Sequence, residues 1–366
     1  MQKNIPFYYK SNRHQLSNDA RAGIKCIIKI FEESKLKKKI ISLLCAAVMA
    51  LGIPVTFAAC KKDDNVIKIN EVTHSVFYAP LYLADALGYF SDEGYEIELT
   101  NGGGADKTMA AVLNGAADVG FCGPEAVIYT HIGGSEDAPK VFGQMTNCDG
   151  SFLVGRKAEP DFKWTDLEGK NVLAGRTGGV PFMTFQYVCK ENGVNANFIT
   201  DVQFDSMTAA FTNGVGDYVT MFEPAASEYQ KSGKGYIVAP VGPAGGEVPY
   251  TCFMAKSSFI EKESGKVDAL LRSITKATKY IYEHDVDDVA EKISKYFDGT
   301  SKESVAVSLK NYKAINTWVP NMAMTESRFN RLQDIIENAG ELKKRVAFSD
   351  IVLTERANEI YKEIYK

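Results

Sequence analysis

Four short stretches carry residue types that could hold a ligand, and each falls between a predicted strand and a predicted helix: 101–105, 123–125, 177–179 and 222–224. In an open α/β sheet, ligands bind beyond the C-terminal ends of the strands, where the helices begin. Glycine there lets the backbone approach a ligand, and the free N–H groups of a helix start favour an anion or a polar oxygen. One such stretch alone is usually a turn, but the four together indicate a binding site.

Two glutamates, Glu125 and Glu223, stand at the starts of predicted helices in these stretches. A carboxylate at a helix N-terminus commonly does no more than stabilise the helix dipole. The functional interpretation is that one or both accept hydrogen bonds from an amine or amidine group of the ligand. Aromatic residues that could form the walls of the site, or stack on a flat ligand, are Phe77, Tyr78, Phe121, Phe182, Phe222 and Tyr250.

One histidine, His74, follows the first predicted strand and would face the same site. It is either a hydrogen-bonding partner of the ligand or a structural histidine, and the sequence leaves both open. His131 and His284 lack the spacing of metal ligands. The sequence also has no GxSxG, HExxH, Walker or GxGxxG motif. We therefore expect no catalytic centre, no metal site and no cofactor.

Seven cysteines are present, and Cys26 and Cys45 fall in the N-terminal leader described next. Cys60 has a role of its own there. The remaining cysteines lack the CxxC spacing of a zinc site, and they are Cys122, Cys148, Cys189 and Cys252. An exported chain could join two of them in a disulfide, but buried free thiols are the expected state.

The N-terminal region has the pattern of a bacterial lipoprotein signal. A basic cluster at 35–39 precedes an almost uncharged apolar run at 40–55, and small residues directly precede Cys60. We expect a signal peptide at 35–59, a Cys60 that is diacylated after cleavage, and a polar tether at 60–65. A plain transmembrane anchor is the alternative. Residues 1–34 fit no signal and are interpreted as an extra or mis-called extension.

The composition is that of a globular protein of about two domains. The chain has 366 residues, of which 45% are hydrophobic and 24% charged, and its formal net charge is −4. Basic residues are spread along the chain and nearly match the acidic ones, so nothing predicts nucleic-acid binding.

Strands and helices alternate through most of the chain, which predicts parallel sheets covered by helices on both faces. The expected strands are 66–72, 95–100, 118–121, 140–145, 151–156, 171–174, 201–204, 217–222, 236–241 and 249–255. The expected helices in the same region are 78–88, 106–113, 125–132, 181–191, 206–211 and one that opens at 223–224. Apolar residues at helical spacing then predict helices over 263–281, 286–297, 302–315 and 326–342.

Two stretches, 146–157 and 250–256, are interpreted as crossings between two lobes. The first lobe would comprise 66–148 and 254–366, with the late helices packed against it, and the second would comprise 149–253. Two crossings form a hinge, and a hinge implies a cleft that closes on a ligand. The predicted fold class is thus α/β, with two Rossmann-like lobes, a two-strand hinge and C-terminal helices.

The two lobes share a local pattern. In the first, a helix stops at Asn114-Gly115 and Asp118 begins a strand; in the second, Asn213-Gly214 and Asp217 stand at the same spacing. Two independent uses of good helix-stop chemistry and homology between the lobes are both open explanations.

Several motifs resemble the nitrate/sulfonate/taurine class of solute-binding proteins of ABC importers, a class that includes binders of thiamine-pyrimidine precursors. They are Ala79-Pro80-Leu81, Gly88-Tyr89-Phe90, Glu93-Gly94, Asn114-Gly115-x-x-Asp118, Leu167-Glu168-Gly169-Lys170, Gly175-x-Thr177 and Phe222-Glu223-Pro224. The resemblance covers about 67–282 and agrees with the lipoprotein signal. It implies a type II periplasmic-binding-protein fold and a monomer anchored by Cys60 to the outer face of the bacterial cytoplasmic membrane. The implied partners are a permease with its ATPase.

The resemblance also implies ligand contacts at Tyr78 and at residues of the four stretches and of the first crossing: Gly103, Gly123, Thr146, Thr177, Gly178, Gly179, Phe222 and Glu223. His74 and Glu125 complete the candidate site. Arg176 is the one arginine near these stretches, while two glutamates are present. This balance favours a small organic ligand with amino groups, such as a pyrimidine, over a simple oxyanion.

Two other function classes were weighed. Some relatives of the pyrimidine-precursor binders are enzymes that synthesise the pyrimidine of thiamine, but the cysteine-rich motif of those enzymes is absent here and the export signal argues against this role. A structural surface lipoprotein with a degenerate cleft is disfavoured by the intact glycine and glutamate stretches.

Overall fold

The computed structural model describes residues 65–203 and 206–366. Asp63–Lys366 forms one compact unit. The predicted N-terminal extension, the signal peptide, the lipidated Cys60 and nearly all of the tether lie outside the described residues.

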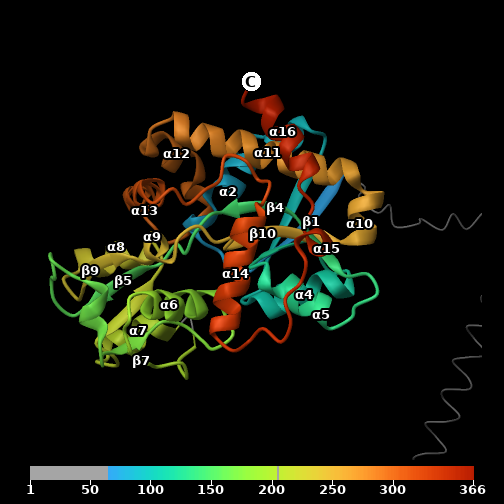
Figure 1. Ribbon diagram of the computed structural model, residues 1–366. Helices are drawn as coiled ribbons and strands as arrows, with labels where there is room; N and C mark the ends of the chain where they lie inside the picture. Colours follow the sequence, from blue (N-terminus) through green and yellow to red (C-terminus); the bar gives the residue numbers. More distant parts are fainter. Residues whose placement is uncertain (1–64, 204–205) are drawn as a thin grey trace, which may run out of the picture. The chain divides into compact units, whose positions relative to one another are not determined.

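The first sheet contains strands that precede the second sheet in the chain and one, β10, that follows it (Figure 1). Its order is β2-β1-β3-β10-β4, with β1 parallel to β2 and β3, and β10 antiparallel to β3 and β4. The strands are β1 (Val66–Glu71), β2 (Glu96–Asn101), β3 (Val119–Cys122), β4 (Pro139–Thr146) and β10 (Thr251–Lys256). Most residues of β3, β4 and β10 are buried, as expected for strands covered on both faces.

The second sheet repeats this arrangement in the order β7-β6-β8-β5-β9. Its strands are β5 (Phe152–Gly155), β6 (Asn171–Leu173), β7 (Asn197–Phe198), β8 (Tyr218–Met221) and β9 (Tyr236–Pro240). The antiparallel fourth strand of each sheet is the strand that the chain forms directly after a crossing, β5 in one and β10 in the other. This reciprocal exchange confirms the predicted α/β fold class of type II.

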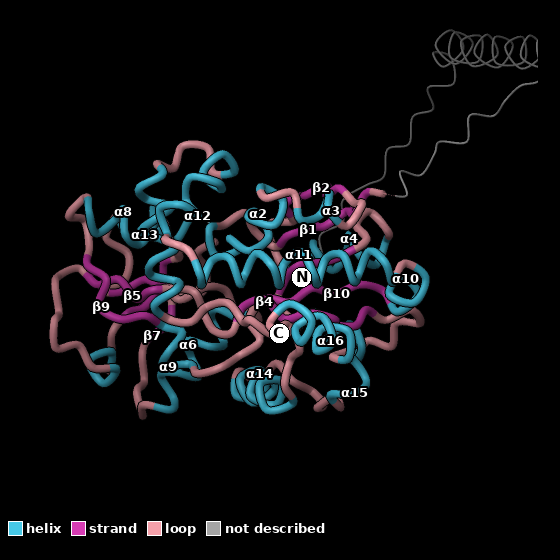
Figure 2. The backbone as a smooth tube through the Cα atoms, turned by 90° about the horizontal axis from the view of Figure 1, so that it is seen from above, coloured by secondary structure: helices cyan, strands magenta, loops and turns pink. Residues whose placement is uncertain are grey.

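Helices lie beside the strands of both sheets, as Figure 2 shows from above. Those that follow strands of the first sheet are η1 (Val76–Tyr78), α2 (Ala79–Ala86), α3 (Tyr89–Asp92), α4 (Ala105–Asn114) and α5 (Glu125–Ile132). Those that follow strands of the second sheet are η2 (Trp164–Leu167), α6 (Val180–Glu191), α7 (Met207–Thr212), α8 (Ala225–Lys231) and α9 (Val241–Gly245). The rest are α10 (Ser257–Lys262), α11 (Ser264–Glu283), α12 (Val286–Ile293), η4 (Ser294–Tyr296), α13 (Lys302–Ala314), α14 (Glu326–Asn338), α15 (Phe348–Ile351) and α16 (Glu355–Ile364).

The repeated sequence pattern has the same geometry in both sheets. The Asp118 carboxylate accepts a hydrogen bond from the backbone N–H of Lys68 at 3.0 Å, and the Asp118 N–H donates to the carbonyl of Lys68 at 2.9 Å. Asp217 makes the same pair of bonds with Asn171, at 2.8 Å and 2.7 Å. Each aspartate therefore fixes the start of one strand, β3 or β8, against its parallel neighbour, β1 or β6.

Two expectations from the sequence are wrong. The strand expected at 201–204 is absent where it is described: 201–203 are non-strand, and the edge strand is β7, a few residues earlier. The late helices do not pack against the first lobe alone either: α14 packs against α6, and α13 contacts α8 as well as η1, and both α6 and α8 follow strands of the second sheet (Figure 1). The helices α15 and α16 were not expected. Whether the two sheets move as separate lobes stays a prediction.

Candidate functional site

An aromatic cluster joins the two sheets where the strands end. Phe77 of η1 is at its centre. The centroid of the Phe77 ring lies 5.5 Å from that of Phe222, 5.9 Å from that of Tyr250 and 5.2 Å from that of Tyr312. Phe222 follows β8, Tyr250 precedes β10, and Tyr312 belongs to α13. Tyr78 continues the cluster to Phe121 of β3, at 4.6 Å. Residues predicted as walls of the site are thus brought together, whereas Phe182 packs elsewhere, against Phe198.

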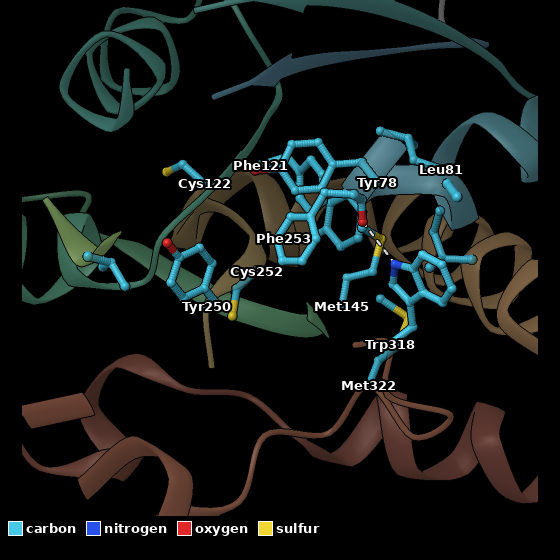
Figure 3. Close-up of a cluster of buried hydrophobic side chains, with 14 of the residues drawn as sticks. Tyr78, Leu81, Phe121, Cys122, Met145, Tyr250, Cys252, Phe253, Trp318 and Met322 are labelled. Carbon is cyan, nitrogen blue, oxygen red and sulfur yellow. Dashed lines mark hydrogen bonds between the residues drawn. The ribbon is translucent and has the colours of Figure 1, made fainter. Parts of the chain in front are cut away.

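The cluster rests on a tightly packed base (Figure 3). Phe121 stacks on Phe253 of β10 with centroids 4.3 Å apart. Trp318, which is 1% exposed, donates its indole N–H to the carbonyl oxygen of Phe77 at 2.8 Å. The backbone at the start of η1 is therefore held by a residue from the C-terminal part of the chain.

The carboxylate of Glu125 is buried next to this cluster. Glu125 begins α5, is 4% exposed, and its Oε2 has no hydrogen-bond partner among the described residues. The carboxylate folds back over Gly123, where a Cβ atom would overlap it, so residue 123 must be a glycine in this arrangement. Burial raises the pKa of Glu125 to about 7, although the backbone N–H groups of the helix start oppose the shift.

A second buried carboxylate, Asp149, lies on the first crossing between β4 and β5. It is 1% exposed, and its Oδ1 accepts a hydrogen bond from the N–H of Ser151 at 2.6 Å, while Oδ2 has no partner within the described chain. Burial raises the pKa of Asp149 to about 6. Asp149 is not among the predicted site residues, although an aspartate within a predicted crossing could have indicated it.

Tyr250, on the second crossing, lies beside both carboxylates. Burial raises the pKa of Tyr250, and the charges of Asp149 and of Glu125 add to the shift. Its hydroxyl approaches Asp149, and in the described part of the chain this buried hydroxyl makes no hydrogen bond of standard geometry. Three unsatisfied oxygens therefore gather at the junction of the two sheets.

The two crossings are also bonded to each other. The Thr146 hydroxyl accepts a hydrogen bond from the N–H of Thr251 at 2.8 Å, and the Thr251 hydroxyl donates to the Tyr78 hydroxyl at 3.5 Å. Thr146 is fully buried. This predicted ligand residue thus lies at the end of β4, where it holds the first crossing against the second.

Glu223 connects the second sheet to α13. It is 2% exposed; its Oε1 accepts from the Ser227 hydroxyl and from the Asn311 side-chain amide, both at 2.6 Å, and its Oε2 accepts from the N–H of Ser227 at 3.0 Å. Its own N–H donates to the Tyr312 hydroxyl at 3.0 Å. Asn311 and Tyr312 carried no signal in the sequence, since α13 is distant in the chain from β8.

His74 is engaged by protein groups on both ring nitrogens. Nδ1 lies 2.8 Å from the buried carboxylate of Glu71, and Nε2 lies 2.7 Å from the carbonyl oxygen of Tyr296. The Tyr82 hydroxyl donates to the same carboxylate at 2.5 Å. The hydrogen bond to Glu71 raises the pKa of His74, with burial acting in the opposite direction. This geometry favours the structural interpretation of His74 over a ligand contact.

The glycine residues of the other two stretches begin α4 and α6. Gly103 has φ +67° and donates its N–H to the Asn101 side chain at 2.9 Å, and Gly178 has φ +81°. Such positive φ values suit glycine. Thr177 is exposed and Gly179 half-buried, and across the described residues no hydrogen bond joins these stretches to the aromatic cluster.

Comparison with known proteins identifies the family. A family model described as "NMT1/THI5 like" matches residues 76–287. A relative from Bacillus subtilis (strain 168), described as "Putative binding protein YtlA", is 36% identical over 87% of this chain and 97% of its own length. The chain belongs to the NMT1/THI5-like family. The resemblance seen in the sequence motifs is thereby confirmed.

Solved structures agree on the fold of this NMT1/THI5-like protein. The nitrate-binding protein NrtA from Synechocystis is 14% identical, with a TM-score of 0.65 over 82% of this chain and 89% of that one. The alkanesulfonate-binding protein SsuA from Xanthomonas axonopodis, bound to MOPS, is 15% identical, with a TM-score of 0.63 over 79% of this chain and 98% of that one. The desulfurization enzyme DSZB shares the fold at 13% identity, with a TM-score of 0.56 over 82% of this chain and 99% of that one. These identities establish a shared fold and no more.

Other site chemistries have no support in the part of the chain that is described. There, no cluster of His, Cys, Asp or Glu is arranged to hold a metal ion. Cys122, Cys148, Cys189 and Cys252 are buried free thiols, as expected, and burial raises the pKa of each. None of the helices in 65–203 and 206–366 combines the length and apolarity needed to cross a bilayer.

The His74–Glu71 contact predicts a pH-dependent stability in this family member. Because the pKa of His74 is raised above its usual 6.5, its charged form is favoured in the folded state. The stabilisation is fully present below pH 6.5 and is lost as the pH rises through the folded-state pKa. The melting temperature of the wild type minus that of His74→Gln should therefore be largest near pH 5.5 and shrink toward pH 8.5. A difference that stays constant or grows with pH would contradict this assignment.

Proposed function

We propose that this chain is the solute-binding component of an ABC import system, which captures a small organic molecule at the junction of its two sheets and delivers it to a permease with its ATPase. The observation that carries the proposal is the group of buried, unsatisfied oxygens on Glu125, Asp149 and Tyr250 beside an aromatic cluster. Buried polar groups are nearly always hydrogen-bonded in folded proteins. A ligand that supplies donors there accounts for these exceptions.

The two crossings supply the mechanism of capture. Asp149 and Tyr250 lie on different crossings, Glu125 follows a strand of the first sheet, and Phe222 and Glu223 follow a strand of the second. A ligand that contacts groups on both sides favours the arrangement in which the sheets approach each other. Closure around the ligand then presents one defined surface to the permease. The stretches at Gly103 and at 177–179 remain proposed contacts of a larger ligand.

The protein is proposed to act as an exported monomer attached to the outer face of the cytoplasmic membrane through lipidated Cys60. The support is the sequence of 35–60, and the binding-protein relatives fit an exported location. Closure and release require no covalent chemistry, no cofactor and no nucleic acid. The alternative of a pyrimidine-synthesising enzyme is kept open by the fold shared with an enzyme.

Native mass spectrometry separates the binder from the enzyme. A binding protein purified without denaturation should carry its ligand, and the ligand should keep its mass after long incubation with fresh protein. Product formed in catalytic excess over protein would favour the enzyme.

Replacing Cys60 by Ala should release the protein from the membrane. The variant has no thiol to acylate, and each lost acyl methylene removes about 0.8 kcal/mol of membrane binding. Membrane and soluble fractions of cells that express the wild type or Cys60→Ala are compared by immunoblot, with the buried Cys189→Ala as a control that keeps its membrane location. Unchanged membrane association of Cys60→Ala would refute lipid anchoring.

Replacing Glu223 by Gln should weaken binding of the ligand that co-purifies with the protein by about 10- to 100-fold, because a charge-assisted hydrogen bond contributes roughly 1.5–3 kcal/mol. Calorimetric titration measures this loss.

Asn311→Ala is the matched control for Glu223→Gln. It removes the bond from α13 to Glu223 but leaves the carboxylate and its charge in place. It should lower the ligand-free melting temperature and preserve affinity. If Glu223→Gln binds as tightly as the wild type, and only its melting temperature falls, the role of Glu223 is structural.

A further inference from the structure

The carboxylates of Glu125 and Asp149 are buried without a counter-charge. Each keeps one oxygen without a hydrogen-bond partner in the described chain. Among the described residues, the buried basic side chain is Lys266, and its ammonium group donates to the carbonyl of Val66 at 2.8 Å, at the start of β1. The two carboxylates therefore have no protein cation that neutralises them.

Burial in this form costs free energy, since an ionised carboxylate loses its hydration without gaining a partner. The raised pKa values of both groups, about 7 for Glu125 and about 6 for Asp149, reflect this cost. A carboxylate that served only the fold would be expected to have partners for both oxygens, as Glu71 has in His74 and Tyr82. Buried charges that the fold leaves unpaired are expected at functional sites.

Glu159, in the segment between β5 and η2, provides the contrast. Glu159 lines an open depression of about 460 Å³ together with Tyr218, and its Oε2 accepts a hydrogen bond from the Tyr218 hydroxyl at 2.8 Å. There the tyrosine and the carboxylate satisfy each other. Beside Asp149, by contrast, the Tyr250 hydroxyl remains unbonded.

We propose that Glu125 and Asp149 select a ligand that carries an amidinium, an ammonium or a comparable group of several N–H donors on a flat ring. The donors would bond to the free Oε2 and Oδ2 atoms, and the Tyr250 hydroxyl would bond to the same group or to a neighbouring ring atom. Phe77, Phe222 and Tyr250 offer the ring faces and edges for the flat part of the ligand. The proposal rests on the proposed binding function and names its substrate class.

The same geometry disfavours an oxyanion. A sulfonate or a nitrate at this place would meet two carboxylates instead of N–H donors or cations, and like charges in a poorly hydrated site repel strongly. The ligand class of this chain is therefore inferred to differ from the anions that the names of NrtA and SsuA indicate for those proteins.

Four small probes that share a six-membered aromatic ring test the class: benzamidine and benzylamine as cations, benzyl alcohol as a neutral donor, and benzenesulfonate as an anion. Binding of each at up to 10 mM is measured by ligand-observed NMR and by thermal shift on the protein from residue 60 onward. Benzamidine is expected to bind at least tenfold more tightly than benzyl alcohol, and benzenesulfonate not at all. Preferential binding of benzenesulfonate, or no binding of either cation, would overturn the proposal.

Substitutions of Glu125 and Asp149 test whether these two carboxylates bind the cationic probe. Glu125→Gln and Asp149→Asn should each weaken benzamidine binding about 10- to 100-fold, and neither should lower the ligand-free melting temperature, because each removes an uncompensated buried charge. Glu159→Gln is the matched control, and its benzamidine affinity should equal that of the wild type. Unchanged affinity in both site variants would overturn the assignment.

Failure of this proposal is distinguishable from failure of the binding function. If benzamidine does not bind but a ligand of another class co-purifies unmodified, the protein is a solute-binding protein and the cation assignment is wrong. If a co-purified molecule is instead converted to product, the binding function itself is wrong.

Discussion

The proposed ligand site of this protein is located by two carboxylates that are buried without a counter-charge. Interior carboxylates are costly unless they are bonded, and Glu125 and Asp149 each retain an unbonded oxygen. The structure around them is otherwise well satisfied: Glu71, Thr146 and Glu223 all have partners at hydrogen-bond distance. Three of the buried oxygens without a partner in the described chain, on Glu125, Asp149 and Tyr250, lie where the two sheets meet, and ligand sites occur preferentially at interfaces between domains.

The topology explains why the site lies there. Each sheet receives one antiparallel strand directly after a crossing, so both crossings run through the junction between the sheets. Asp149 follows β4, after which the chain leaves the first sheet, and Tyr250 precedes β10, the strand that returns to it. A ligand bound to both residues therefore contacts the segments that must change conformation if the sheets move. In this proposal, Asp149 and Tyr250 both recognise the ligand and lie on the segments that would move when the two sheets close on it.

The sequence predicted most of the fold, because strand and helix patterns are local. Residue types and spacing predicted the strands β3 and β8, the helix stops at Gly115 and Gly214, and the two crossings. The edge strand β7 was misplaced because it has only two residues, Asn197–Phe198, and is held by pairing with β6 and not by a pattern of its own. The helices α13 and α14 carry ordinary amphipathic patterns, which show that one face is buried but not against which sheet.

The site was predicted in part, for similar reasons. Glu125 and Glu223 were found because a glutamate at a helix start after a buried strand is a local pattern, but their difference was not visible: one lacks a partner for Oε2, and the other is bonded by Asn311 from far along the chain. His74 was found by position and proved to be held by Glu71 and Tyr296. Asp149 was missed because only the fold buries it.

Hydrogen–deuterium exchange with and without the co-purified ligand tests most directly whether a ligand is held between the two sheets. The account predicts slower exchange on both sides of the junction: at the start of α5 in the first sheet, at the start of α8 in the second, and at Ser151 on the first crossing. Protection confined to one sheet, with exchange at the crossings unchanged, would contradict it.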